Sequence, residues 1–372
     1  MDETTYRILD TLWRETGKTI SIHELTSRIK GSYGTAYYPN IYDKAHELAT
    51  DGTITLTKTG RSSLANLNFA NYLLIDLLTE LEIKRKHDLL TKSKELQMLF
   101  KDAEERYDDI RSIESISAIS AEKNLELNRT EMLFLLHYTN NHHLQSDIKR
   151  IHAIARDLQA LHNIRIDSLI LTTTEFIELL TSNEINPLKE MLYDKISFHA
   201  PQDFWFHTST ALTKGYRIGL LNTQTNPARI AEKDLAFNLA RFGYKEIGPE
   251  IREGQRICME YIIVSLMRNG DARHIEAIPI LLAKNTTNYN LLIFLSEKYG
   301  LSGLLIGLLK ALERIRPSEE TEMAIEILES MKPKEIRVDT KSIYGKMKLY
   351  GAIEQQETAR LSRKSTKSST RV

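Results

Sequence analysis

Two short runs of alternating polar and apolar residues constrain the fold of this chain more than any other feature. Ile54–Lys58 and Leu64–Asn68 alternate with period two, and the polar segment Thr59–Ser63 joins them. Such alternation around a polar turn is typical of a β-hairpin with one buried face. The N-terminal part of the chain therefore contains a two-stranded hairpin.

Three segments with helical periodicity precede this hairpin. The first covers residues 5–16 and ends at Gly17. The second begins at Ser21, which has capping-box spacing with Glu24. The third covers residues 38–50, has Pro39 in its first turn, and is ended by Asp51-Gly52. The sequence thus predicts three short helices followed by a hairpin.

This order of elements resembles, over about residues 4–70, the winged helix-turn-helix of archaeal and bacterial transcription regulators. The resemblance implies that the third helix lies in the major groove of DNA and that the hairpin, the wing, approaches the phosphates. The candidate DNA contacts are Tyr33, Thr35, Tyr37, Tyr38, Asn40, Tyr42 and Lys44 beside or on the third helix, and Lys58, Arg61 and Ser62 on the wing.

Arg61 is the strongest single candidate, because an arginine on a wing neutralises phosphate charge. The third helix is only modestly basic, since Asp43, Glu47 and Asp51 dilute its charge. A winged helix used for protein contacts or dimerisation therefore stays open, and the tyrosines can equally be packing residues.

Residues 71–108 are expected to form a linking helical segment. Residues 69–100 have a strong apolar face and predict one long helix or two. The run Lys84-Arg85-Lys86 is interpreted as a solvated face, and contact with DNA flanking the site is the alternative.

Residues 109–208 alternate strand and helix patterns, which predicts a small α/β domain. Strands are expected at 131–138, 165–171 and 196–199, and a short strand or amphipathic turn at 113–119. The expected helices are 144–162, a segment capped by Thr174 that runs to Leu180, and 187–193.

Part of this domain, with the strand Ile166–Leu171, the pair Glu175-Phe176 and the pair Phe204-Trp205, resembles the nucleotidyltransferase fold that archaea attach to winged helices. Active members carry Gly-Ser, then Asp-x-Asp, and a further carboxylate on a later strand, which together hold divalent metals. Residues 110–138 contain neither motif, and Asp167 is the only candidate for the later carboxylate. A lone Asp cannot hold two magnesium ions. We therefore expect a scaffold or sensor with no catalytic residue, metal or cofactor.

Other chemical motifs are missing from the sequence, including Walker A, Gly-x-Gly-x-x-Gly, His-Glu-x-x-His and Gly-x-Ser-x-Gly. His142-His143 lies near Asp147 but is interpreted as part of a polar loop before a helix. Cys258, the single cysteine, stands in an apolar run and is expected to be a buried hydrophobic residue.

Residues 209–350 predict a helical domain. The expected helices are 230–242, 251–268, 274–283, 290–298, 304–315 and a last one at 319–331. The run 273–282 resembles a segment that recurs in archaeal proteins of unassigned function; it is interpreted as helix packing, with a protein-binding surface as the alternative.

Residues 351–372 are expected to be a disordered tail, basic from Arg360 onward through Arg363, Lys364, Lys367 and Arg371. Such a tail either adds non-specific affinity for DNA or serves only as a solubilising terminus. The whole chain has 50 basic and 50 acidic residues, a balance that can hide a local basic patch. Without a signal peptide or membrane-span pattern, a cytoplasmic location is the expectation.

These patterns predict an α+β, mainly helical protein with an N-terminal winged helix-turn-helix (1–70), a small central α/β domain and a C-terminal helical domain. The expected function is binding of double-stranded DNA as a transcriptional regulator, as a homodimer because one winged helix contacts few base pairs. The rival interpretations are a protein-interaction scaffold that never touches DNA and an active nucleotidyltransferase.

Overall fold

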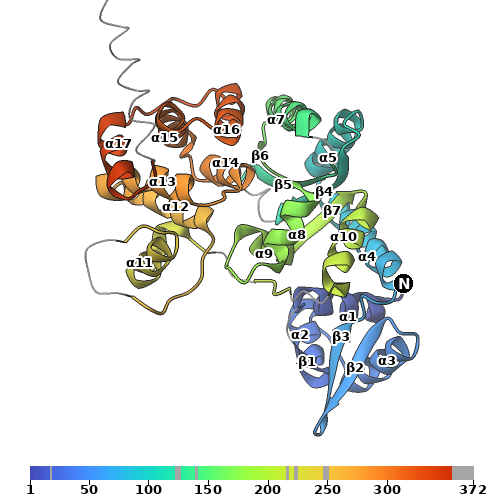
Figure 1. Ribbon diagram of the computed structural model, residues 1–372. Coiled ribbons are helices and arrows are strands. Elements are labelled where there is room, and N and C mark those ends of the chain that lie inside the picture. The colour runs from blue at the N-terminus through green and yellow to red at the C-terminus, as the bar shows by residue number, and fades with distance from the viewer. Residues whose placement is uncertain are drawn as a thin grey trace, which may run out of the picture. The chain divides into compact units, whose positions relative to one another are not determined.

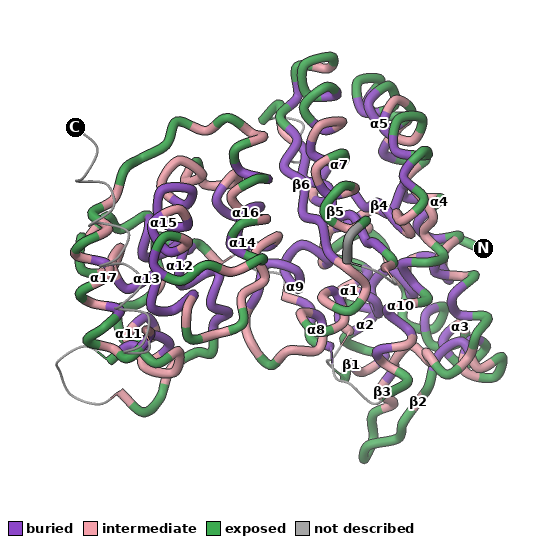
Figure 2. The backbone as a smooth tube through the Cα atoms, turned by 45° about the horizontal axis from the view of Figure 1, so that its top comes forward, coloured by how far each residue is buried: buried purple, intermediate pink, exposed green. Residues whose placement is uncertain are grey.

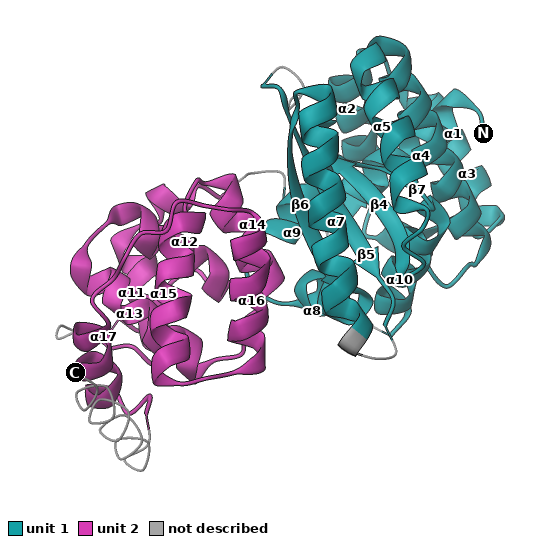
Figure 3. Ribbon diagram, turned by 90° about the horizontal axis from the view of Figure 1, so that it is seen from above, with its two compact units in different colours: residues 1–224 teal, residues 225–372 magenta. Residues whose placement is uncertain are grey.

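The computed structural model describes residues 1–16, 19–121, 127–138, 141–214, 218–221, 225–245 and 251–353. It is mixed α+β and mostly helical, with 62% helix and 13% strand, as the sequence predicts. The chain divides into two compact units, residues 1–224 and 225–372 (Figure 3). The predicted boundary at 208/209 falls instead inside a helix, α10, of the first unit.

The first elements of unit 1 build a small helical layer on a three-stranded antiparallel sheet of order β1-β3-β2 (Figure 1). The elements are α1 (Glu3–Arg14), β1 (Ile20–Ser21), α2 (Ile22–Tyr33), α3 (Tyr38–Thr50), β2 (Ile54–Thr59) and β3 (Ser62–Leu67). Their core includes fully buried Ile8, Leu9, Trp13, Leu25 and Ala45.

Local chemistry sets several of these boundaries. The Ser21 hydroxyl accepts a hydrogen bond from the Glu24 amide at 3.1 Å, which caps α2 as predicted. The hairpin differs from the expected five-residue turn: Thr59 pairs with Ser62, so only Gly60 and Arg61 form the turn. Gly60 has φ +61, the left-handed conformation that tight hairpin turns require. Arg61 therefore stands at the very tip of the hairpin.

Two helices, not one, follow the hairpin. They are α4 (Leu73–Lys92) and α5 (Lys94–Tyr107). Ser93 between them is extended, and its hydroxyl accepts a hydrogen bond from the Leu96 amide. The segment predicted to end at Phe100 thus breaks at Ser93 and continues to Tyr107.

A four-stranded mixed sheet of order β6-β5-β4-β7 forms the rest of unit 1. Its strands are β4 (Ile113–Ile119), β5 (Arg129–Leu136), β6 (Arg165–Thr172) and β7 (Lys195–His199). Only β5 and β6 run parallel to each other; β4 is antiparallel to both of its neighbours. The segment 113–119, predicted as a strand or an amphipathic turn, is a strand.

Helices cover both faces of this sheet (Figure 1). The helices are α7 (Asn141–His162), α8 (Thr173–Thr181), α9 (Pro187–Met191), a 3-10 turn (Leu192–Asp194) and α10 (Pro201–Thr213). α5 and α7 pack on one face, and α8 and α10 on the other. The cap of α8 is Thr172, not Thr174, because Thr172 and Glu175 make a reciprocal capping box.

Unit 2 is helical in its described residues. Its elements are a 3-10 turn (Pro227–Arg229), α11 (Glu232–Arg241), α12 (Met259–Asn269), α13 (Ala272–Lys284), α14 (Tyr289–Lys298), α15 (Ser302–Ile315), α16 (Glu319–Ser330) and α17 (Thr340–Leu349). Cys258 is buried at the start of α12, as expected.

Two predictions for unit 2 are wrong. The helix expected from Ile251 begins only at Met259, because the Asp234 and Asn238 side chains bind the amides of Gln255 and Ile257 and hold this stretch against α11. The helix at 319–331 is not the last one, since α17 follows it. Gly17 and the basic tail beyond Arg360 lie outside the described residues.

Candidate nucleic-acid interface

The tip of the β2–β3 hairpin is the most exposed part of the N-terminal elements. Lys58, Arg61 and Ser62 are exposed there, and Figure 2 shows the whole turn as exposed. Within the described part of the chain, no ion pair engages the Lys58 or Arg61 side chain. The three wing candidates therefore lie together on one accessible, basic projection.

The start of α3 presents three aromatic side chains to solvent. Tyr37, Tyr38 and Tyr42 are 71%, 44% and 38% exposed, and Asn40 is exposed between them. The Tyr38 and Tyr42 ring centroids lie 5.8 Å apart, and the Tyr42 and His46 centroids 4.4 Å apart. These rings follow the four-residue spacing of one helix side, so they form a continuous exposed row.

The Lys44 ammonium is already engaged. It lies 2.7 Å from Glu47 Oε2 and 3.3 Å from Asp2 Oδ2. The hydrogen bond with Glu47 is the largest of the effects that raise the pKa of Lys44. α3 therefore offers less free positive charge than its sequence suggests, while Asp43 is exposed on it.

Tyr33 is an anchor rather than a surface contact. Its hydroxyl donates to Asp10 Oδ2 at 2.6 Å, and burial followed by the Asp10 charge raises its pKa above the ordinary tyrosine value. Arg7 lies over the Tyr33 ring and donates to the Thr35 carbonyl at 3.2 Å. These contacts hold the turn between α2 and α3 against α1. Of the two candidate DNA contacts in this turn, Tyr33 and Thr35, only Thr35 has an exposed side chain.

The prediction of a solvated face at residues 84–86 is wrong for its central residue. Arg85 is buried, and its guanidinium lies 3.6 Å from Glu82, 3.7 Å from Asp10 and 3.9 Å from Asp194. Burial lowers the pKa of Arg85, but Asp10 and Glu82 outweigh it, so the pKa is raised overall. Lys84 contacts Glu3, and Lys86 contacts Glu104 and the Phe198 carbonyl.

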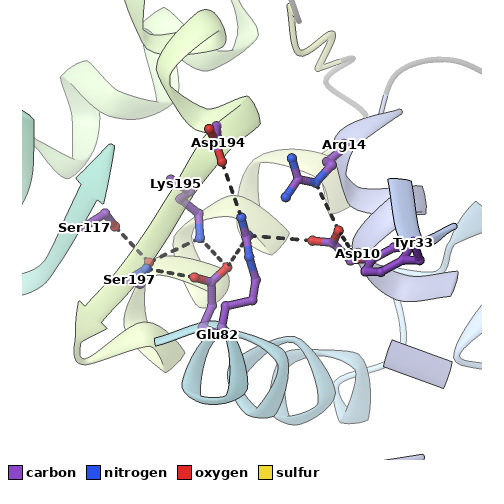
Figure 4. Close-up of polar contacts among 9 residues, drawn as sticks. Asp10, Arg14, Tyr33, Glu82, Ser117, Asp194, Lys195 and Ser197 are labelled. Atoms are coloured by element: carbon purple, nitrogen blue, oxygen red, sulfur yellow. Dashed lines mark hydrogen bonds and ion pairs between the residues drawn. The ribbon is translucent and has the colours of Figure 1, made fainter. Parts of the chain in front are cut away.

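A buried polar network joins α1, α4 and β7 around this arginine (Figure 4). The Lys195 ammonium donates to Glu82 Oε1 at 2.7 Å, and the Ser197 amide donates to Glu82 Oε2 at 2.8 Å. Burial lowers the pKa of Lys195 to about 8 although Glu82 opposes the shift. The network fixes the N-terminal elements against the central sheet.

Asp167, the one carboxylate singled out in the central domain, has a carboxylate neighbour that sequence reasoning missed. Glu131 on β5 is the register partner of Asp167 on the parallel strand β6. Arg129 lies between them, with Nε 2.5 Å from Asp167 Oδ2 and Nη2 3.2 Å from Glu131 Oε1. Arg165 lies 3.0 Å from Asp167 Oδ1. Strand register, which a single sequence does not reveal, brings these four residues together.

His142 and His143 lie in the first turn of α7, so the prediction of a polar loop before a helix is wrong for these two residues. The His142 side chain lies outside the described residues, and Asp147 accepts hydrogen bonds from Ser112 and Tyr138. Among the residues described, no group of three or more His, Cys, Asp or Glu side chains is arranged to hold a metal ion.

No helix in the described ranges has the length and apolar character needed to cross a membrane. No protein-family model, no curated protein and no solved structure matches this chain.

Proposed function

We propose that residues 1–70 form a winged helix-turn-helix that binds double-stranded DNA, and that the protein is a transcriptional regulator. The observation that carries this proposal is the hairpin, which presents Lys58, Arg61 and Ser62 beyond a three-helix core. The order of three helices and the sheet β1-β3-β2 supports it, because a recognition helix and a wing then share one small domain.

The central domain is proposed to act as a scaffold or sensor without transfer chemistry. In the family it resembles, carboxylates on neighbouring strands share divalent metal ions. Here Glu131 and Asp167 share the Arg129 guanidinium instead. A fixed cation in this position supplies the charge neutralisation that a metal would otherwise provide, so the carboxylate pair is satisfied without one.

The test of DNA binding is fluorescence anisotropy of a labelled mixed-sequence duplex, titrated with protein from low to physiological salt. Affinity should fall as salt rises, and Arg61→Ala should weaken binding and reduce the salt slope by about 0.9, the contribution of one phosphate contact. Arg111→Ala, which removes an exposed arginine outside residues 1–70, should leave both quantities unchanged.

A chain ending at Gln356 separates the wing from the basic tail. If this truncation alone removes binding, the tail supplies the affinity. If the full chain does not bind duplex DNA even at low salt, the winged helix serves protein contacts, an alternative that the exposed Tyr38 and Tyr42 rings and the acidic Asp43 favour. Sedimentation with and without duplex tests the homodimer that belongs to this proposal.

A further inference from the structure

The exposed side chains at the start of α3 are a selective set. Apart from Pro39, they are the amide of Asn40 and the rings of Tyr37, Tyr38 and Tyr42. α3 contains no arginine, and its single lysine, Lys44, is held by Glu47 and Asp2. Its first turn has no acidic residue, whereas Asp43 and Glu47 follow in the later turns.

In the major groove, different bases are recognised by different side chains. Arginine or lysine recognises guanine, asparagine pairs with N6 and N7 of adenine, and apolar groups contact the 5-methyl group of thymine. The N-terminal residues of a recognition helix are the ones that reach base edges. Residues 37–42, at the start of α3, therefore carry groups suited to A·T pairs and include no lysine or arginine to bind guanine.

We propose that α3 selects A·T base pairs through the major groove, with Asn40 on adenine and the Tyr38 and Tyr42 rings against thymine methyl groups. This inference rests on the proposed DNA binding. The rings already pack against one another in tilted pairs, Tyr38 with Tyr42 and Tyr42 with His46, so less side-chain freedom is lost on binding.

The test compares four alternating duplexes at one salt concentration: d(A-T), d(A-U), d(I-C) and d(G-C). Uracil lacks only the thymine methyl group, so d(A-U) should bind about fourfold more weakly than d(A-T) for each methyl contacted. Inosine-cytosine pairs have the major-groove hydrogen-bonding pattern of G·C but the minor groove of A·T. The duplex d(I-C) should therefore bind as weakly as d(G-C).

Variants assign the effect to single side chains. Asn40→Ala should weaken binding to d(A-T) by roughly five- to hundredfold while leaving d(G-C) unchanged. Tyr42→Ala should reduce the difference between d(A-T) and d(A-U), and Tyr38→Ala/Tyr42→Ala should abolish it. Tyr72→Ala, which removes a tyrosine 61% exposed at the start of α4, is the matched control and should change nothing. Circular dichroism melting checks that each variant folds. The comparison of the four duplexes with wild-type protein does not depend on the variants.

Three results would overturn the inference. If d(I-C) binds as tightly as d(A-T), the A·T preference comes from the minor groove, where the wing rather than α3 senses groove width. If all four duplexes bind equally, α3 does not select bases. Both results leave the proposed DNA binding intact, whereas no binding to any duplex at low salt overturns the inference and the proposed function together.

Discussion

The Lys195 ammonium lies 2.7 Å from Glu82 Oε1, and both side chains are fully buried. The ammonium also lies 3.9 Å from the ring centroid of Phe204 and 4.4 Å from that of Trp205. A buried charge needs a partner, because an uncompensated one carries a large desolvation penalty. Cation–π contacts with the aromatic rings around Lys195 compensate for only part of its lost hydration.

Removing the lysine should therefore destabilise unit 1 strongly. Lys195→Met leaves the Glu82 carboxylate buried without the ammonium that it binds. We expect a loss of roughly 3–5 kcal/mol in the free energy of unfolding. Lys84→Met, which breaks a partly exposed pair between α4 and Glu3 of α1, should cost less than about 1 kcal/mol. Urea unfolding followed by tryptophan emission measures both, since Trp13 and Trp205 pack edge to face near Lys195 and are the two tryptophans of the chain.

The double variant Glu82→Gln/Lys195→Met is the control for this argument. Glutamine keeps an acceptor for the Ser197 amide but removes the buried negative charge. The double variant should thus be more stable than Lys195→Met alone. A double variant as unstable as the sum of its single changes would show that the two charges do not act as a pair.

The same lysine predicts a pH dependence. Burial lowers the pKa of Lys195 to about 8, against 10.5 for an ordinary lysine. Between these values the unfolded chain binds this proton more tightly than the folded one, so the contribution of Lys195 to the free energy of unfolding rises with pH. Tryptophan emission should change with a midpoint near pH 8 as the ammonium beside Trp205 loses its proton. Persistence of that transition in Lys195→Met would assign it to another group.

Local patterns in the sequence were sufficient for many elements and insufficient for the network around Lys195. Pro39 and the apolar spacing of residues 38–50 predict α3 at the bounds observed, because helix periodicity and capping are local properties. The burial of Arg85 was not predicted, because it depends on residues far away in the sequence. In sequence Arg85 is the middle of a basic run, and only the distant Asp10 and Asp194 make its burial possible.

In the candidate interface, too, local sequence patterns predict some features and distant residues determine others. The wing residues and the α3 tyrosines are exposed where the sequence places them, because alternation and helical spacing determine which side faces solvent. Tyr33 differs, since its hydroxyl binds Asp10 on another helix. Glu131 went unnoticed because its pairing with Asp167 depends on strand register.

Arg129 gives a prediction that tests the proposed scaffold role of the central domain. Arg129→Ala leaves Glu131 and Asp167 side by side without their shared cation, and we expect a loss of roughly 3 kcal/mol in the free energy of unfolding. Magnesium should restore part of this loss in the variant, because carboxylate oxygens are its preferred ligands. Thermal melting with and without magnesium measures this. Equal stabilisation of the wild type by magnesium would contradict the proposed scaffold and favour a metal-binding site.

Two glycines of α15 give a prediction for unit 2. The segment after α16 runs across α15, and the Ile336 amide donates to the Gly303 carbonyl at 2.8 Å. A Cβ at Gly303 would overlap the Lys334 carbonyl oxygen, and one at Gly307 the Ile336 carbonyl oxygen. Backbone atoms cannot move aside as a flexible side chain does.

Gly303→Ala and Gly307→Ala should therefore each destabilise unit 2 by about 1–3 kcal/mol, the usual cost of overpacking. Gly345→Ala is the matched control, since Gly345 also lies in a helix but a Cβ there meets no atom within 4 Å. This change should stabilise α17 by about 0.5–1 kcal/mol, because alanine loses less backbone freedom than glycine on folding. Calorimetric melting of the full chain measures all three. If the α15 variants are as stable as Gly345→Ala, the segment 334–338 does not pack on α15 in solution.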